Sequence, residues 1–167
     1  MNHPHRPEGV DLAARSRSRR RALQAIYAWQ VGGNRMAQVI EQFRHEQDME
    51  IADLEYFEDL LRGIEKHLAG LDAGIRTHID REVEEVDPIE RAALRIAAYE
   101  LRHRPDVPYR VVINEALEVT KRFGADQGHT YVNGVLDKLA AEVVGELTDM
   151  AMAAQIAESE VTPVLGH

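Results

Sequence analysis

The sequence predicts an all-α fold, because apolar residues recur at alternating spacings of three and four along most of its 167 positions. No stretch alternates apolar and polar residues over the length of a β-strand, and no internal repeat is visible. Glycines and prolines divide the apolar stripes into segments of helical length. Aromatic residues make up only 5% of the chain, so the core of this helical bundle is expected to be mostly aliphatic.

The first half of the chain predicts three helices. The first begins at Leu12 and ends at Gly32, Gly33 and Asn34, and its stripe comprises Ala22, Leu23, Ile26, Tyr27 and Gln30. A short second helix is marked by Val39, Ile40 and Phe43. A third begins after Asp48 and has the strongest amphipathic pattern, carried by Leu54, Phe57, Leu61, Ile64 and Leu68. Gly70 and Gly74 weaken its continuation, although a further helix could be lined by Leu71, Ile75 and Ile79.

The second half predicts three more helices. Asp87, Pro88 and Glu90 form a helix start, since aspartate accepts from free backbone N–H groups and proline suits the first turn. Pro105 and Pro108 then require an extended link. The next helix carries Ile113, Ala116, Leu117 and Thr120 and closes at Gly124 as a C-terminal cap. The last long helix carries Val132, Val135, Leu136, Leu139, Val143 and Leu147.

The length fits one domain, which we place at residues 12–150. Residues 1–11 are expected to form a disordered arm and residues 151–167 a frayed tail. The chain has no cysteine, which excludes disulfides, thiolate metal sites and cysteine nucleophiles and favours a cytoplasmic location. We find no signal peptide and no apolar run that could span a membrane.

Charge is distributed unevenly along the chain. The net charge is -9, yet residues 1–21 contain six arginines and only two acidic residues. Cations at the positive end of a helix oppose its macrodipole, so the arginines of this first helix favour an anionic partner such as RNA phosphate. The candidate phosphate contacts are Arg15, Arg17, Arg19, Arg20 and Arg21. A solvated helix surface or a non-specific basic tail is the plainer interpretation of the same residues.

Three other features of the sequence bear on function. Tyr27 lies two turns after Arg20 on the same helix face and could stack on a base, although a core tyrosine would have the same spacing. The glycine-rich segment FGADQGHTYVNG at 123–134 is a binding loop or a plain interhelical turn, with equal support for each. An acidic stretch contains Glu84 and Glu90 and is a solvated face or a docking surface for a basic protein.

A catalytic interpretation finds no support in the sequence. HExxH, GxSxG and phosphate-loop motifs are all missing, as are paired Glu-x-x-His segments. His3 and His5 on the N-terminal arm are interpreted as an inert tail rather than a metal site. We therefore predict a protein that is not an enzyme and needs no cofactor or metal.

Several blocks of the sequence resemble the NusB family of transcription antitermination factors. These are ALQAIYAWQ at 22–30, YFEDLLRGI at 56–64, RAALRIAAYEL at 91–101 and DVPYRVVINEALEVTKRFGADQGHTYVNGVLDKLA at 106–140. The resemblance implies a compact bundle of about seven helices in two subdomains. It also implies pairing with NusE, a small-subunit ribosomal protein, to bind the boxA element of nascent RNA. Through other Nus factors the complex would act on RNA polymerase at ribosomal RNA operons.

The same resemblance implies which residues serve each surface. The RNA surface would comprise the arginine-rich start of the first helix with Gln24, Tyr27, Phe123, Gln127 and Tyr131, and the NusE surface would use Glu84 and Glu90. Two positions depart from the common family pattern, since Gln127 replaces an acid and Tyr131 replaces phenylalanine. The rival interpretations are an RNA-binding module of a ribosomal RNA cytosine methyltransferase, which would need a catalytic domain and cysteines, and a helical adaptor outside antitermination.

Overall fold

The computed structural model describes residues 9–165, with side chains except at 47–48 and 161–165. Within this range the chain forms six α-helices and two 3-10 helices and no strand, which confirms the predicted all-α class. The α-helices are α1 (Leu12–Gly32), α2 (Met36–Arg44), α3 (Leu54–Arg76), α4 (Pro88–His103), α5 (Tyr109–Phe123) and α6 (Gly128–Leu165). The 3-10 helices are η1 (Gln47–Ile51) and η2 (Val83–Glu85). Residues 1–8 of the predicted arm lie outside the described residues.

Aspartates fix the starts of three helices. The side chain of Asp11 accepts from the backbone of Ala14, and Asp53 accepts from Tyr56, both at 3.0 Å. Asp87 accepts from two backbone N–H groups of the first turn of α4, as its sequence context predicts. Gly33 ends α1 in the left-handed region with φ of 73°, which glycine adopts without strain.

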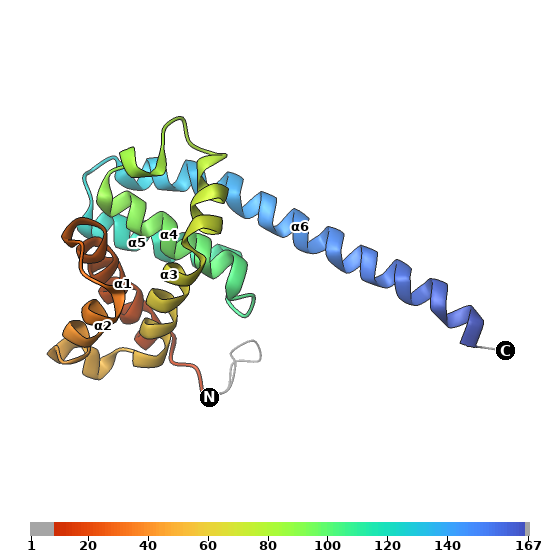
Figure 1. Ribbon diagram of the computed structural model, residues 1–167, viewed down its shortest axis with the longest axis horizontal. Coiled ribbons are helices and arrows are strands. Elements are labelled where there is room, and N and C mark those ends of the chain that lie inside the picture. The colour runs from red at the N-terminus through yellow and green to blue at the C-terminus, as the bar shows by residue number, and fades with distance from the viewer. Residues whose placement is uncertain (1–8, 166–167) are drawn as a thin grey trace.

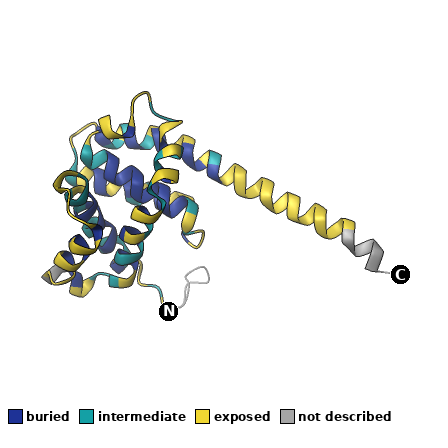
Figure 2. Cartoon of the chain, viewed as in Figure 1, coloured by how far each residue is buried: buried dark blue, intermediate teal, exposed yellow. Residues whose placement is uncertain are grey.

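The core is organised around α4. Every residue from 91 to 101 is buried (Figure 2), and alanines at four of these positions let neighbouring helices approach closely. On the α3 side, a Cβ atom on Gly63 would lie 2.2 Å from Tyr99 Cε1. Glycine at position 63 is therefore required by the packing of α3 on α4.

A kink explains why six helices are found where about seven were expected. His67 has non-helical backbone angles inside α3, with φ of −105° and ψ of 15°. The chain nevertheless continues as helix past Gly70 and Gly74, and Leu71 and Ile75 are buried on its inner face. The predicted further helix is thus the second half of α3, which ends at Arg76, before Ile79.

The last two helices differ from the sequence expectations in two respects. Gly124 follows α5 as predicted, but its backbone is extended rather than left-handed. A Cβ atom there would lie 2.8 Å from the Thr120 carbonyl oxygen, so close contact explains the glycine. The predicted frayed tail is instead helical as far as Leu165. It forms the outer part of α6, which continues away from the body (Figure 1). None of the described helices combines the length and apolarity needed to cross a membrane.

Candidate nucleic-acid interface

Four predicted RNA-binding residues form a stripe along α1. Arg17, Arg20, Gln24 and Tyr27 follow one another at spacings of three and four, so they share one helix face. Tyr27 is exposed. Arg17 Nη1 donates to the Ile51 carbonyl oxygen at 2.9 Å, which holds its side chain beside η1. This set of four residues is called the α1 stripe below.

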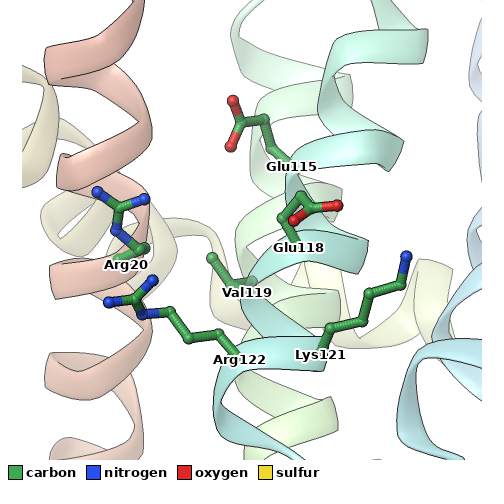
Figure 3. Close-up of a pocket in the computed structure, with 6 residues that line it drawn as sticks. All are labelled: Arg20, Glu115, Glu118, Val119, Lys121 and Arg122. Carbon is green, nitrogen blue, oxygen red and sulfur yellow. The ribbon is translucent and has the colours of Figure 1, made fainter.

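Arg20 lies at a groove between α1 and α5. The groove has a volume of about 230 Å³ and is lined by Arg20, Glu115, Glu118, Val119, Lys121 and Arg122. The side chain of Arg122 extends from α5 toward α1, the helix that carries Arg20 (Figure 3). Within the described part of the chain, the side chains of Arg20, Lys121 and Arg122 form no hydrogen bond or ion pair. Three cations without a carboxylate partner make this α1–α5 groove a local source of positive potential.

The acidic residues of the groove do not offset this charge fully. Glu115 accepts a hydrogen bond from the Ser16 hydroxyl and lies 3.4 Å from Arg19 Nη1, so its charge is directed toward the interior. Glu118 is exposed on α5. The groove can therefore accept an anion between its guanidinium groups, which bind phosphate through paired N–H donors.

Arg19, which the sequence placed with the candidate phosphate contacts, is buried, unlike its neighbour Arg20. Only 4% of its side chain is exposed, and its Nε and Nη2 atoms donate to the Glu100 carboxylate at 2.8–3.0 Å. Nη2 also lies 3.3 Å from the Tyr56 hydroxyl. Burial alone would lower the pKa of Arg19, but its hydrogen bonds to Glu100 and the charge of that carboxylate raise it above its ordinary value. The Arg19 side chain is thus part of the core rather than of the exposed surface of α1.

Arg15 and Arg21 are both engaged within the protein. The Arg15 guanidinium lies 4.4 Å from the centre of the Tyr56 ring and 3.4 Å from Asp106. Arg21 forms an ion pair with Glu46, donates to Gln24 and lies over Phe43. Their contacts with RNA would have to compete with these interactions, so Arg20 is the most available of the five predicted arginines.

Of the predicted binding loop at 123–134, only residues 124–127 lie between α5 and α6, because residues 128–134 form the first turns of α6. Phe123 ends α5 and is half-buried, while Gln127 is exposed just before α6. Tyr131 is half-buried, with the Arg81 guanidinium 5.3 Å from its ring centre. The Tyr131 hydroxyl is buried and has no hydrogen-bond partner among the described residues, and burial raises the pKa of this hydroxyl. One ring surface of Tyr131 is therefore already occupied.

The first turn of α4 connects this loop to the end of α1. Gln30 of α1 donates to the Pro88 carbonyl oxygen at 2.9 Å. The next residue, Ile89, lies 3.3 Å from the Cβ position of Gly124, and the Glu90 carboxylate lies 3.1 Å from that of Gly128. The structure thus brings the C-terminal end of α1 and the loop to the same end of α4, although they are far apart in the sequence.

The two predicted partner-binding acids have different surroundings. Glu84 is exposed, and its Oε1 lies 3.2 Å from Arg95, whose guanidinium also pairs with Asp72. Glu90 is half-buried beside Gly128, and burial followed by the charge of Asp87 raises the pKa of its carboxyl. Glu90 therefore lies against the start of α6, next to the predicted RNA loop, whereas Glu84 is accessible from solvent.

Lys121 and Arg122 were missed as candidates from the sequence. Cations in the last turn of a helix ordinarily offset its dipole, and this explanation is sufficient without any ligand. Their position directly before Phe123, within a block that resembles the family, was the available signal. Only the packing of α5 beside α1 places them with Arg20.

Comparison with known proteins identifies the family. The NusB family model matches residues 16–141. The chain is 62% identical over 137 residues to transcription antitermination protein NusB of Xanthomonas axonopodis pv. citri, covering 82% of this chain and 86% of that protein. The same protein of Xylella fastidiosa is also 62% identical over 137 residues, with 82% and 87% covered.

Solved structures agree with this assignment. T. maritima NusB superimposes with a TM-score of 0.67 at 28% identity, covering 85% of this chain and 94% of that one. The complex of antitermination factors NusB and NusE with dsRNA has a chain of the same fold, with a TM-score of 0.67, 22% identity, and 79% and 99% covered. The sequence matches and the shared helical fold together show that this chain belongs to the NusB family.

Proposed function

We propose that this chain is a transcription antitermination factor that binds boxA of nascent RNA together with NusE. In this role it supports processive transcription of ribosomal RNA operons by RNA polymerase. Relatives at 61–62% identity are antitermination proteins, and NusB, NusE and RNA are assembled in one solved complex of the same fold. The observation that carries the RNA contact is the α1–α5 groove, where three cations have no carboxylate partner.

In this proposal the groove holds the RNA backbone and the α1 stripe holds a base. A phosphate placed between Arg20 and Arg122 would receive N–H donors from both helices and relieve the repulsion between the two guanidinium groups. Tyr27, two turns further along α1, presents an exposed ring for stacking. Gln24, Phe123, Gln127 and Tyr131 complete the proposed surface, and Arg15, Arg17 and Arg21 contribute charge at its edge.

The salt dependence of RNA binding tests the groove. Each phosphate contact with single-stranded RNA contributes about 0.7 to the slope of log K against log salt concentration. We expect the Arg20→Ala variant to bind boxA RNA more weakly than the parent and to have a slope smaller by about 0.7. Titration of labelled boxA RNA at several salt concentrations, with and without NusE, measures both quantities.

Arg62→Ala is the matched control, because Arg62 is an exposed arginine on α3 that does not line the groove. It should leave the slope unchanged. Equal slopes for the parent and Arg20→Ala would remove the groove from the RNA surface. Absence of RNA binding both with and without NusE would overturn the proposed function in favour of a helical adaptor.

NusE binding is proposed to use Glu84, with Glu90 as an inner contact. The chain carries a net charge of -9, so a basic ribosomal protein docked on an acidic surface would be attracted to it and would extend the positive potential available to RNA. Because coupling between two ligands is reciprocal, NusE and RNA should each strengthen binding of the other by the same factor.

Charge reversal at Glu84 tests this surface. Glu84→Lys should weaken NusE binding in calorimetry and lower the RNA affinity of the ternary complex, while binary RNA binding stays intact. Glu65→Lys, an equivalent change at an exposed position of α3, is the control. Thermal melting checks that both variants are folded. If NusE binds folded Glu84→Lys as tightly as the parent, the partner surface lies elsewhere.

A further inference from the structure

The outer part of α6, residues 144–160, extends from the body as an exposed helix. All of its side chains are exposed in the structure, whereas earlier residues of the same helix pack in the body (Figure 2). At a rise of about 1.5 Å per residue, this segment extends about 25 Å. An isolated helix of this length is only marginally stable in water, so a partner surface would be expected to stabilise it. We call residues 144–160 the α6 arm.

The apolar stripe of the body continues without a break onto the α6 arm. Inside the body the stripe consists of three buried residues, Leu136, Ala140 and Val143. On the arm it continues at alternating spacings of four and three through Leu147, Met150, Ala154 and Ala157. This heptad spacing keeps one seam along the helix, which is the pattern that packs against a second helix. The arm thus presents one of the two apolar seams that a pair of packed helices needs.

Charge indicates what kind of helix would complete the pair. After Lys138 the sequence has no lysine or arginine, whereas the part of α6 beyond that residue carries five acidic residues, Glu142, Glu146, Asp149, Glu158 and Glu160. Two copies of the arm would bring acidic residues together with no basic residue to pair with them. Lysines or arginines flanking the seam of a different helix would instead meet carboxylates.

We propose that the α6 arm is a docking surface for a basic amphipathic helix of another protein. The apolar seam of the partner packs on Leu147, Met150, Ala154 and Ala157, and its flanking cations face the acidic side chains. Glu146 already accepts a hydrogen bond from Arg102 at 2.9 Å, which ties the start of the arm to α4 and fixes its direction. The surface is separate from the α1–α5 groove, so a partner bound here leaves the groove open.

A designed peptide tests the proposal with the full chain. The probe is a fluorescent 21-residue helix with leucine at the seam positions and lysine at the flanking positions. Its control carries glutamate in place of lysine. We expect the lysine peptide to bind about tenfold or more tightly than the glutamate peptide in anisotropy titrations, with the preference decreasing as salt is raised.

Two methionines provide a matched pair of variants. Met150 lies on the seam and Met152 on the opposite face, and they are 68% and 56% exposed. Met150→Gln should weaken binding of the lysine peptide about tenfold, because burial of the side chain on the seam is lost. Met152→Gln should bind like the parent, which separates the seam from general changes in helicity.

Three results would contradict the proposed docking surface. Failure of the lysine peptide to bind, or equal weakening by both glutamine variants, overturns the proposal. Sedimentation of the chain alone should find a monomer. A dimer that is lost in Met150→Gln but kept in Met152→Gln would identify a second copy as the occupant and would also overturn it. RNA binding is measured separately, so each of these results leaves the proposed antitermination function standing.

Discussion

Arg19→Met is expected to destabilise the protein by about 3–5 kcal/mol, because it leaves Glu100 charged and buried without its counter-ion. The side chains of Arg19 and Glu100 are 4% and 1% exposed, and three N–H···O contacts of 2.8–3.0 Å join them. After the change, the Tyr56 hydroxyl would still donate to the Glu100 carboxylate, but the paired guanidinium donors and their positive charge would be lost. Urea unfolding monitored by circular dichroism measures the loss.

The neighbouring arginine supplies the control. Arg20→Met should change the free energy of unfolding by less than about 0.5 kcal/mol, since Arg20 lies at the surface groove. In the double variant Arg19→Met/Glu100→Met, most of the stability should return, because neither buried charge remains. Folded Arg19→Met should bind RNA like the parent. Weaker RNA binding with unchanged stability would return Arg19 to the RNA surface.

The contrast between Arg19 and Arg20 defines what the sequence could not predict. Adjacent residues of a helix point about 100° apart, so one arginine of the cluster must face inward if α1 packs on α4. The identity of that residue depends on Glu100, which is 81 positions away. No local pattern contains this pairing. The RNA-binding role of the cluster stays a prediction, and the structure divides its members into a core residue, two engaged residues and two members of the α1 stripe.

Helix boundaries could be predicted from the sequence more readily than the Arg19–Glu100 pair, because a capping residue contacts its own helix within a few positions. The start at Pro88 and the end of α1 follow from Asp87 and Gly33, each of which contacts or ends its own helix. The tail was predicted as frayed because the apolar pattern fades beyond about Met150. Alanine, methionine and glutamate nevertheless favour helix by themselves, so α6 continues through residues that the body does not cover.

Tyr27→Ala should weaken binding of boxA RNA by about 1–3 kcal/mol while leaving the fold nearly as stable as the parent. An aromatic ring that is exposed in the free protein contributes little to the core, and a base can stack on it without displacing another side chain. Tyr131 is less available, since Arg81 already lies over its ring and its hydroxyl is buried. We therefore expect Tyr131→Ala to reduce stability as well as affinity.

Tyr109 is the matched control for this measurement. It is 42% exposed, compared with 39% for Tyr27, but it begins α5 at the end of that helix remote from Phe123 and the loop. Tyr109→Ala should therefore bind RNA like the parent in the same titration. If Tyr27→Ala and Tyr109→Ala both bind RNA as tightly as the parent, stacking on the α1 stripe is excluded. If Tyr27→Ala instead unfolds at lower urea concentration and its folded fraction binds RNA normally, then Tyr27 supports the fold, and the base contact must come from the loop.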